Sequence, residues 1–234
     1  MRWRLAGLWL VALLLAGCAG ASGESGKASL WVTSDRGRHV MLLRSVPAGQ
    51  TAMQALEGAA DVKTRYGGRF VQSIDGIEGN ASGRRDWFYF VNGIEADRSA
   101  AEYRLHPGDV EWWDYRSWAG RMEQPVVVGA FPEPFVHGYG GHHRAAAVRY
   151  TRPSLARAAR AVARRIRASS VAPAGTPVPG NVNLVLVRTG TPSAVAFPRR
   201  SGYSAGDPVT FVLSGDASRL ARDPALVRRR YRWP

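Results

Sequence analysis

The sequence WFYFVNG at residues 87–93, read together with GDVEWWDY at residues 108–115, decides the fold of this chain. Each segment predicts a short strand dense in aromatic residues, and each is joined to a tight turn by glycine. Successive side chains point to opposite faces of a strand, so aromatic rings occupy both faces of these two strands. A core needs rings on only one face. The rings on the second face must therefore cover something else, and a flat or apolar ligand is a natural candidate.

Strand alternation sorts these rings into two sets. Trp87 and Tyr89 share one face of the first strand, and Trp113 and Tyr115 share one face of the second, with Trp112 on the opposite face. One set forms core, and the other either stacks on a ligand or packs under the C-terminal part of the chain. The dipeptides at 92–93 and 108–109 have the composition of tight turns. The candidate ligand-binding residues are Trp87, Tyr89, Asn92, Trp112, Trp113 and Tyr115.

The first 18 residues predict a bacterial lipoprotein signal. Residues 1–4 are positively charged and residues 5–17 are apolar, about the length of a signal-peptide core and too short for a membrane span. The segment Leu15-Ala16-Gly17-Cys18 matches the lipobox, in which the cysteine is acylated. Residues 19–28 predict a flexible tether. We therefore expect a mature protein held outside the cytoplasmic membrane, in the cell envelope, by lipid on Cys18.

Charge divides the remainder of the chain. Residues 24–119 hold 12 Lys and Arg against 13 Asp and Glu, whereas residues 120–234 hold 18 against 5. Nearly all of the net charge of +14 therefore lies in the C-terminal part. Such asymmetry is typical of two domains, which we place at residues 29–119 and 125–234.

The first domain is expected to be α+β, with a small mixed sheet covered by one helix. Strands are predicted at residues 30–33, 39–45, 69–74, 87–91 and 110–118, and a helix at 52–60 with Thr51 as its N-cap. The basic second domain is also predicted to be a small α+β unit. Its expected elements are strands at 126–128, 183–187, 194–197 and 209–213, a helix at 153–169, and a linker at 171–180.

Four segments of the first domain resemble the transcobalamin C-terminal-like family, a β-grasp-type ligand-binding domain. They are VPAGQTAMQAL at 46–56, GRFVQSI at 68–74, WFYFVNG at 87–93, and YRLHPGDV at 103–110 followed by Trp112. The resemblance covers residues 29–118. It implies a β-grasp fold and, because the family includes vitamin carriers, cobalamin or another corrinoid as a ligand. The larger helical domain that helps those carriers enclose cobalamin has no counterpart in this sequence.

Two further features have several interpretations. A glycine-rich loop contains His137, His142 and His143, which are weak candidates for a metal site or for the axial ligand of a corrinoid cobalt; a mobile loop is the alternative we favour. The arginines of the helix at 153–169 have three interpretations. They form a solvated face, they lie on anionic lipid, or they bind an acidic polymer. The export prediction argues against nucleic acid, and we favour packing with attraction to anionic lipid through Arg157, Arg160, Arg164 and Arg165.

The motifs of common enzymes are missing: no nucleophile elbow, phosphate loop or zinc motif is found in the sequence. We therefore expect no enzyme. The leading hypothesis is an exported, lipid-anchored binding protein for cobalamin or another corrinoid, delivering it to a membrane transporter. The rival hypothesis is an envelope interaction or adhesion module without a small ligand. Exposure of the aromatic rings distinguishes the two, since a binding protein needs several of them open in a cleft.

Overall fold

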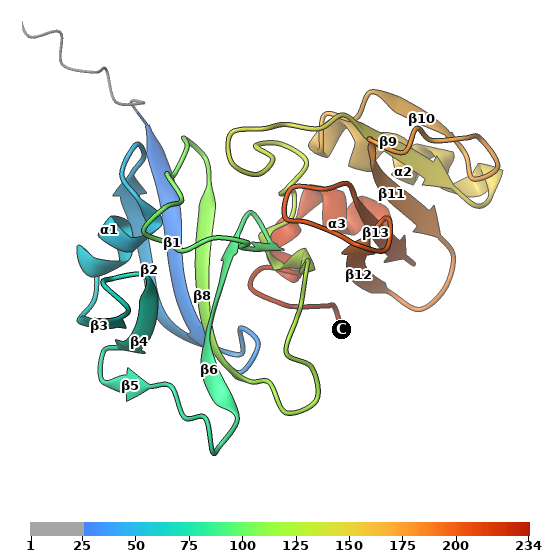
Figure 1. Cartoon of the computed structure of the whole chain (residues 1–234). Coiled ribbons are helices and arrows are strands. Elements are labelled where there is room, and N and C mark those ends of the chain that lie inside the picture. Colours follow the sequence, from blue (N-terminus) through green and yellow to red (C-terminus); the bar gives the residue numbers. More distant parts are fainter. Residues whose placement is uncertain (1–25) are drawn as a thin grey trace, which may run out of the picture.

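The computed structural model describes residues 26–234, which form three β-sheets; the two five-stranded sheets lie side by side (Figure 1). The predicted signal peptide, Cys18 and residues 19–25 of the predicted tether lie outside the described residues. The end of the tether prediction is wrong, because residues 27 and 28 already belong to strand β1 (Lys27–Ser34). Within the described part, no helix is long and apolar enough to cross a membrane. The α+β fold class predicted from the sequence is confirmed.

The first sheet has five strands in the order β2-β1-β8-β6-β7. Only the central pair, β1 and β8, is parallel, so the sheet is mixed as expected. The turn between β6 and β7 uses Asn92 and Gly93 with φ of 52° and 76°, the left-handed values that a tight hairpin turn requires. The strands are β1 (Lys27–Ser34), β2 (His39–Pro47), β6 (Arg85–Val91), β7 (Ile94–Glu95) and β8 (Val110–Ser117).

One short helix, α1 (Ala52–Glu57), contributes Met53 and Leu56 to the core of this sheet. The N-cap prediction is confirmed: the Thr51 side chain accepts a hydrogen bond from the Gln54 amide, and the Gln54 side chain accepts one from the Thr51 amide. This reciprocal capping box satisfies two backbone donors that the helix itself leaves free. The helix ends at residue 57, three residues earlier than predicted.

A separate three-stranded sheet packs against the same core. It contains β3 (Val62–Arg65), β4 (Phe70–Ile74) and β5 (Ile77–Glu78), all antiparallel. The strand predicted at 69–74 is therefore present, but it lies outside the main sheet.

The second sheet has the order β10-β9-β11-β13-β12 and is parallel except for the edge strand β12. Two helices, α2 and α3, pack with it around a core of its own. The strands predicted near residues 183, 194 and 209 are confirmed. The elements are β9 (Ala146–Tyr150), η2 (Pro153–Leu155), α2 (Ala156–Arg165), β10 (Ser170–Pro173), β11 (Asn183–Arg188), β12 (Ser193–Pro198), β13 (Val209–Ser214), α3 (Ala217–Arg222) and η3 (Pro224–Leu226).

Two predictions in this part are wrong. The apolar run at 126–128 forms no strand: Val126 makes an isolated bridge to Ile94, and η1 (Val128–Ala130) is a 3₁₀ turn. The linker predicted from residue 171 begins inside β10, which pairs with β9. Short apolar runs do not distinguish a strand from other buried backbone, and this run is buried between the sheets.

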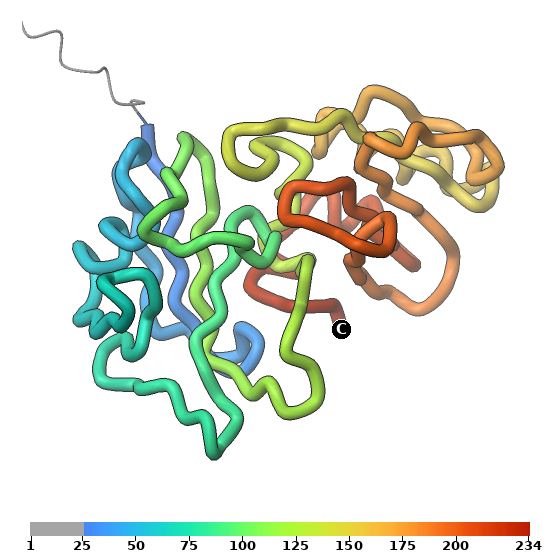
Figure 2. The backbone as a smooth tube through the Cα atoms, in the orientation of Figure 1, coloured from blue at the N-terminus to red at the C-terminus, as the bar shows by residue number. Residues whose placement is uncertain are grey.

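The C-terminal segment joins the two sheets. The tube in Figure 2 shows the chain returning from the second sheet toward the first at its end. The Tyr231 ring packs with Phe90, Trp112 and Val127 in a small cluster of its own. Farther along, Trp233 exchanges two backbone hydrogen bonds with Ala194 of β12.

Candidate functional site between the sheets

The predicted ring set on one face of β6 and β8 packs in the core of the first sheet. Trp113 stacks on Tyr89 with ring centroids 4.8 Å apart, and Trp87 lies 5.2 Å from Tyr115. The indole of Trp87 donates to the carbonyl of Ile77 at 2.9 Å, so the β4–β5 hairpin lies against these rings. The structure shows no open stacking surface at these four positions.

The opposite ring set is buried as well. Trp112 has 0 % exposure and packs at 5.5 Å and 89° against Tyr231 from the C-terminal segment. Phe90 lies 5.4 Å from the same tyrosine. Of the two alternatives left open by the sequence, packing under the C-terminal part is the one observed.

Asn92 is also buried, and all its polar side-chain atoms have protein partners. Its amide nitrogen donates to Asp109 Oδ1 at 2.7 Å and to the carbonyl of Gly138 at 2.9 Å, while its oxygen accepts from the Val110 amide. The residue therefore connects the β6–β7 turn to the glycine-rich loop. Its contacts are structural.

The structure separates the three histidines of that loop. His137 Nδ1 lies 2.6 Å from Glu133 Oε1, and His143 Nε2 lies 2.8 Å from the carbonyl of Phe135. His142 lines two cavities. Across residues 26–234, no group of three or more His, Cys, Asp or Glu side chains could hold a metal ion.

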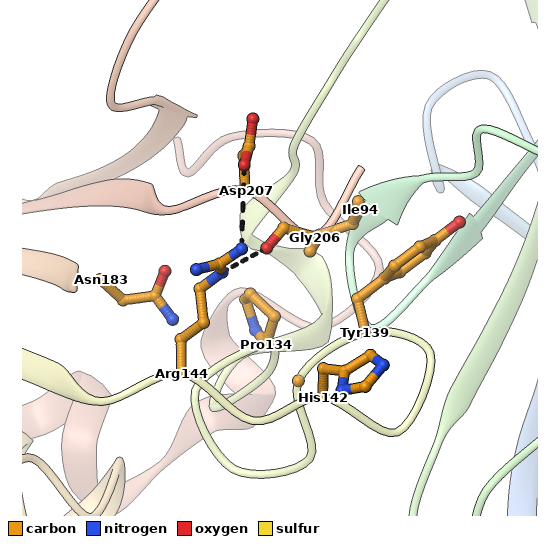
Figure 3. Close-up of a pocket in the computed structure, with 9 residues that line it drawn as sticks. Ile94, Pro134, Tyr139, His142, Arg144, Asn183, Gly206 and Asp207 are labelled. Carbon is orange, nitrogen blue, oxygen red and sulfur yellow. Dashed lines mark hydrogen bonds and ion pairs between the residues drawn. The ribbon is translucent and has the colours of Figure 1, made fainter. Parts of the chain in front are cut away.

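The open space in this region is a cleft between the two sheets. One of its cavities, of about 220 Å³, has two arginines and a histidine in its wall but no carboxylate. A larger cavity of about 380 Å³ shares Ala205 with it and is lined by the carboxylates of Glu95, Asp97 and Glu123. A cavity of about 10 Å³, with Asp207 in its wall, is bounded by Ile94 on one side and Asn183 on the other (Figure 3). The cavity of about 220 Å³ is lined by Arg98, Tyr139, Gly140, His142, Arg144, Ala205 and Gly206.

Arg144 has two partners in the cleft. Its Nε donates to the carbonyl of Gly206 at 2.5 Å, and its guanidinium lies 3.8 Å from Asp207 Oδ1 (Figure 3). Arg200 pairs with the same carboxylate oxygen at 2.9 Å. A hydrogen bond from the Ser204 amide and the arginine charges lower the pKa of Asp207, so this carboxylate stays ionised.

Tyr139 forms the opposite wall. Its hydroxyl donates to Asp97 Oδ1 at 2.9 Å, and the Arg98 guanidinium lies 5.8 Å from the centre of its ring. Burial alone would raise the pKa of Asp97, but the hydrogen bonds from Arg98 and Tyr139 outweigh it and the pKa is lowered. Burial raises the pKa of Tyr139, so this residue remains a neutral phenol.

A buried polar cluster supports this wall from behind. The Tyr103 hydroxyl donates to Asp109 Oδ2 at 3.3 Å and accepts from the Gly140 amide at 2.9 Å. Next to it, Glu111 is almost wholly buried and only its Oε1 has a partner, the indole of Trp113 at 2.7 Å. Burial raises the pKa of Glu111 to about 8.

Sequence reasoning identified only His142 among the residues of the cleft. Arg98, Tyr139, Arg144 and Asp207 come from three separate segments: Tyr139 and Arg144 belong to the glycine-rich loop or follow it directly, and the other two segments carry no recognisable motif. The one local signal was the glycine-rich loop, where Gly138, Gly140 and Gly141 have positive φ.

Comparison with known proteins gives a family match that runs from α1 to β8. Residues 49–117 match the model of a family described as a domain of unknown function (DUF4430). No curated protein matches the chain.

Two solved structures are similar to part of the chain, each with a TM-score of 0.33. A candidate metal-binding protein from Ruminococcus gnavus ATCC 29149 is 15 % identical, with 39 % of this chain and 97 % of that protein covered. Haptocorrin in complex with Cbi is 16 % identical, with 42 % of this chain and 27 % of haptocorrin covered. The resemblance to transcobalamin-like domains is thus supported only as a loose likeness, which gives no information about the ligand.

Proposed function

We propose that this chain is an exported, lipid-anchored small-molecule-binding protein and that its ligand lies in the cleft between the sheets. The cavity lined by Arg98, His142 and Arg144 carries the proposal, because two guanidinium groups and an imidazole surround it without a carboxylate in its wall. Such a wall suits a ligand with a carboxylate or phosphate group.

The two arginines are already positioned for this task. Arg144 is held by Gly206 and Asp207, and Arg98 is held by Asp97 beside the Tyr139 ring. A cation fixed before binding loses little side-chain freedom when the ligand arrives, which favours affinity. The ion pairs reduce the net charge of the site, so we expect moderate rather than very tight binding.

Cobalamin or another corrinoid remains the specific ligand proposed, with a membrane transporter as the recipient. Trp87, Tyr89 and Trp113 cannot stack on it without unpacking the core of the first sheet. A corrinoid is larger than this cavity, so it would lie across the cavity mouth, where Arg144 would hold its phosphate and the imidazole of His142 would be available as a cobalt ligand.

The first experiment is a titration of residues 19–234 with cyano- and hydroxocobalamin, followed by tryptophan fluorescence and corrin absorbance. We expect saturable binding that Arg144→Gln weakens about tenfold, as for a hydrogen bond to a charged group. His142→Ala should remove the absorbance change caused by imidazole binding to cobalt. His39→Ala, on the exposed β2 strand, is the matched control and should bind as the wild type does.

Absence of saturation would exclude the corrinoid. Calorimetry with small carboxylates and phosphates then tests the cleft itself, with Arg144→Gln again as the variant. If none of these ligands binds, the small-molecule proposal fails.

The envelope interaction module is the second candidate function. The sealed aromatic rings favour it, because neither ring set is open to a ligand. The exposed side of β2 adds two apolar side chains, Val40 and Leu43, which are 47 % and 42 % exposed. A protein that binds no small ligand in the titrations above would fit this candidate.

A further inference from the structure

The second sheet carries positive charge without nearby counter-charge. Residues 134–206 contain eleven arginines and no aspartate or glutamate. Five of these arginines lie on or just after α2 and are exposed, namely Arg157, Arg160, Arg164, Arg165 and Arg167. None of the five takes part in an ion pair within residues 26–234. Their mutual repulsion is therefore uncompensated inside the described protein.

Three of the five arginines line one groove. Arg160 and Arg164 are four residues apart, so they lie on one side of α2, and Arg167, just past the end of the helix, lines the same groove. The groove has a volume of about 390 Å³ and runs between α2 and the edge strand β10. Its remaining lining is apolar and is made by Ala163, Ala168 and Val171.

Arg167 holds an unusual backbone conformation at the end of α2. Its φ is 54°, in the left-handed region. The Ala168 amide donates to the carbonyl of Ala163 at 2.8 Å, and the Arg167 amide donates to that of Arg164 at 3.4 Å. This is the Schellman end of a helix, where glycine is strongly preferred. An arginine here is conformationally unfavourable, and such strain often accompanies a functional role.

We propose that the groove formed by Arg160, Arg164 and Arg167 binds the phosphate groups of anionic phospholipids at a membrane surface. Guanidinium groups match phosphate oxygens in geometry and charge, and the apolar lining suits the glycerol region of a lipid. The choice of lipid over a soluble phosphate rests on the proposed lipid anchor, which would keep this surface near a membrane. In the view of Figure 1, α2 and β10 lie at the same upper side as the start of β1.

The test uses residues 19–234, so the result does not depend on acylation of Cys18. Sedimentation is measured with vesicles of phosphatidylcholine alone and with vesicles of phosphatidylcholine and phosphatidylglycerol in equal parts. We expect binding to the anionic vesicles only. Arg164→Gln should weaken it about fivefold, the value of one basic residue near such a surface. Arg165→Gln removes the same charge one residue away, outside the groove, and should have a much smaller effect.

Arg167→Gly separates binding from folding. It should weaken vesicle binding as Arg164→Gln does, while Tm stays equal or rises, because glycine is favoured at this helix end. Equal losses of vesicle binding for Arg164→Gln and Arg165→Gln, or full vesicle binding by Arg167→Gly, would show that the groove is not the lipid-binding site. Binding of inorganic polyphosphate without binding of anionic vesicles would overturn the lipid assignment.

The proposal for the cleft and the proposal for the groove can be tested independently. Arg144→Gln should bind anionic vesicles as the wild type does, and Arg164→Gln should bind the cleft ligand normally.

Discussion

Replacing Tyr231 with alanine is expected to lower the free energy of unfolding by about 3–5 kcal/mol, as for other buried aromatic side chains. The ring is 8 % exposed and packs edge-on against Trp112 and Phe90. Its hydroxyl also donates to Asp114 Oδ2 at 3.0 Å. The variant therefore leaves both a cavity and a buried carboxylate with one donor fewer, and it weakens the contact between the C-terminal segment and the first sheet.

The measurement is urea unfolding followed by tryptophan fluorescence, which also reports water reaching Trp112. Tyr231→Phe is the control, since it keeps the ring and removes only the hydroxyl; we expect a loss of about 1–2 kcal/mol. If Tyr231→Ala cost no more than Tyr231→Phe, the packing of the ring would contribute nothing to the free energy of unfolding.

Asp114 explains why the chain end docks at this place. Its Oδ1 accepts from Thr33 Oγ1 at 2.6 Å and from the Gly37 amide at 3.0 Å, and its Oδ2 accepts from the Arg36 amide at 3.0 Å. Tyr231 supplies the fourth donor. A fully buried carboxylate is costly unless it is hydrogen-bonded in this way. The C-terminal segment thus completes a polar site as well as covering an apolar face.

The parts of the fold that depend on local chemistry were predictable from the sequence. The turn at Asn92 and Gly93 and the cap at Thr51 each follow from a few neighbouring residues, and both are observed. The alternation of rings on β6 and β8 was also predicted, and the two core clusters divide the rings in the predicted way.

What covers the second ring face could not be predicted from local pattern. Tyr231 lies 117 residues from its partner Asp114, and nothing in the composition of the chain end marks it as a partner for an aromatic sheet. The residues of the cleft could not be predicted for the same reason. Arg98 and Arg144 come together only because the two sheets pack side by side, so their spacing in the sequence carries no signal.

The burial of Glu111 could not be predicted for a different reason. In the sequence it is one charged residue in a strand, where alternation does not show that its face is the core. In the structure it lies on the same face as Trp113, with Tyr89 nearby, and burial raises its pKa to about 8. A carboxyl group that remains protonated at neutral pH makes the stability of the fold depend on pH in a direction opposite to that of an ion-paired carboxylate.

The free energy of unfolding should therefore fall as pH rises from about 4.5 to about 8. Between the ordinary glutamate pKa of 4.5, which holds in the unfolded chain, and the folded pKa of about 8, the folded protein keeps the Glu111 proton and the unfolded chain does not. Each pH unit in this window removes about 1.4 kcal/mol from this group alone. Burial also raises the pKa of Asp109 and Glu133, which act with the same sign. The lowered pKa values of Asp97 and Asp207 affect only more acidic solutions.

Glu111→Gln isolates this contribution, because glutamine keeps an oxygen to accept from the Trp113 indole but does not titrate. Urea unfolding between pH 5 and 8 should show a flatter dependence for the variant, with the variant the more stable protein at pH 8 and the difference vanishing near pH 5. Glu57→Gln, on the exposed side of α1, removes a carboxylate without burial and should follow the wild type. Parallel curves for the wild type and Glu111→Gln would mean that Glu111 is ionised in the folded protein. Its burial would then not raise its pKa.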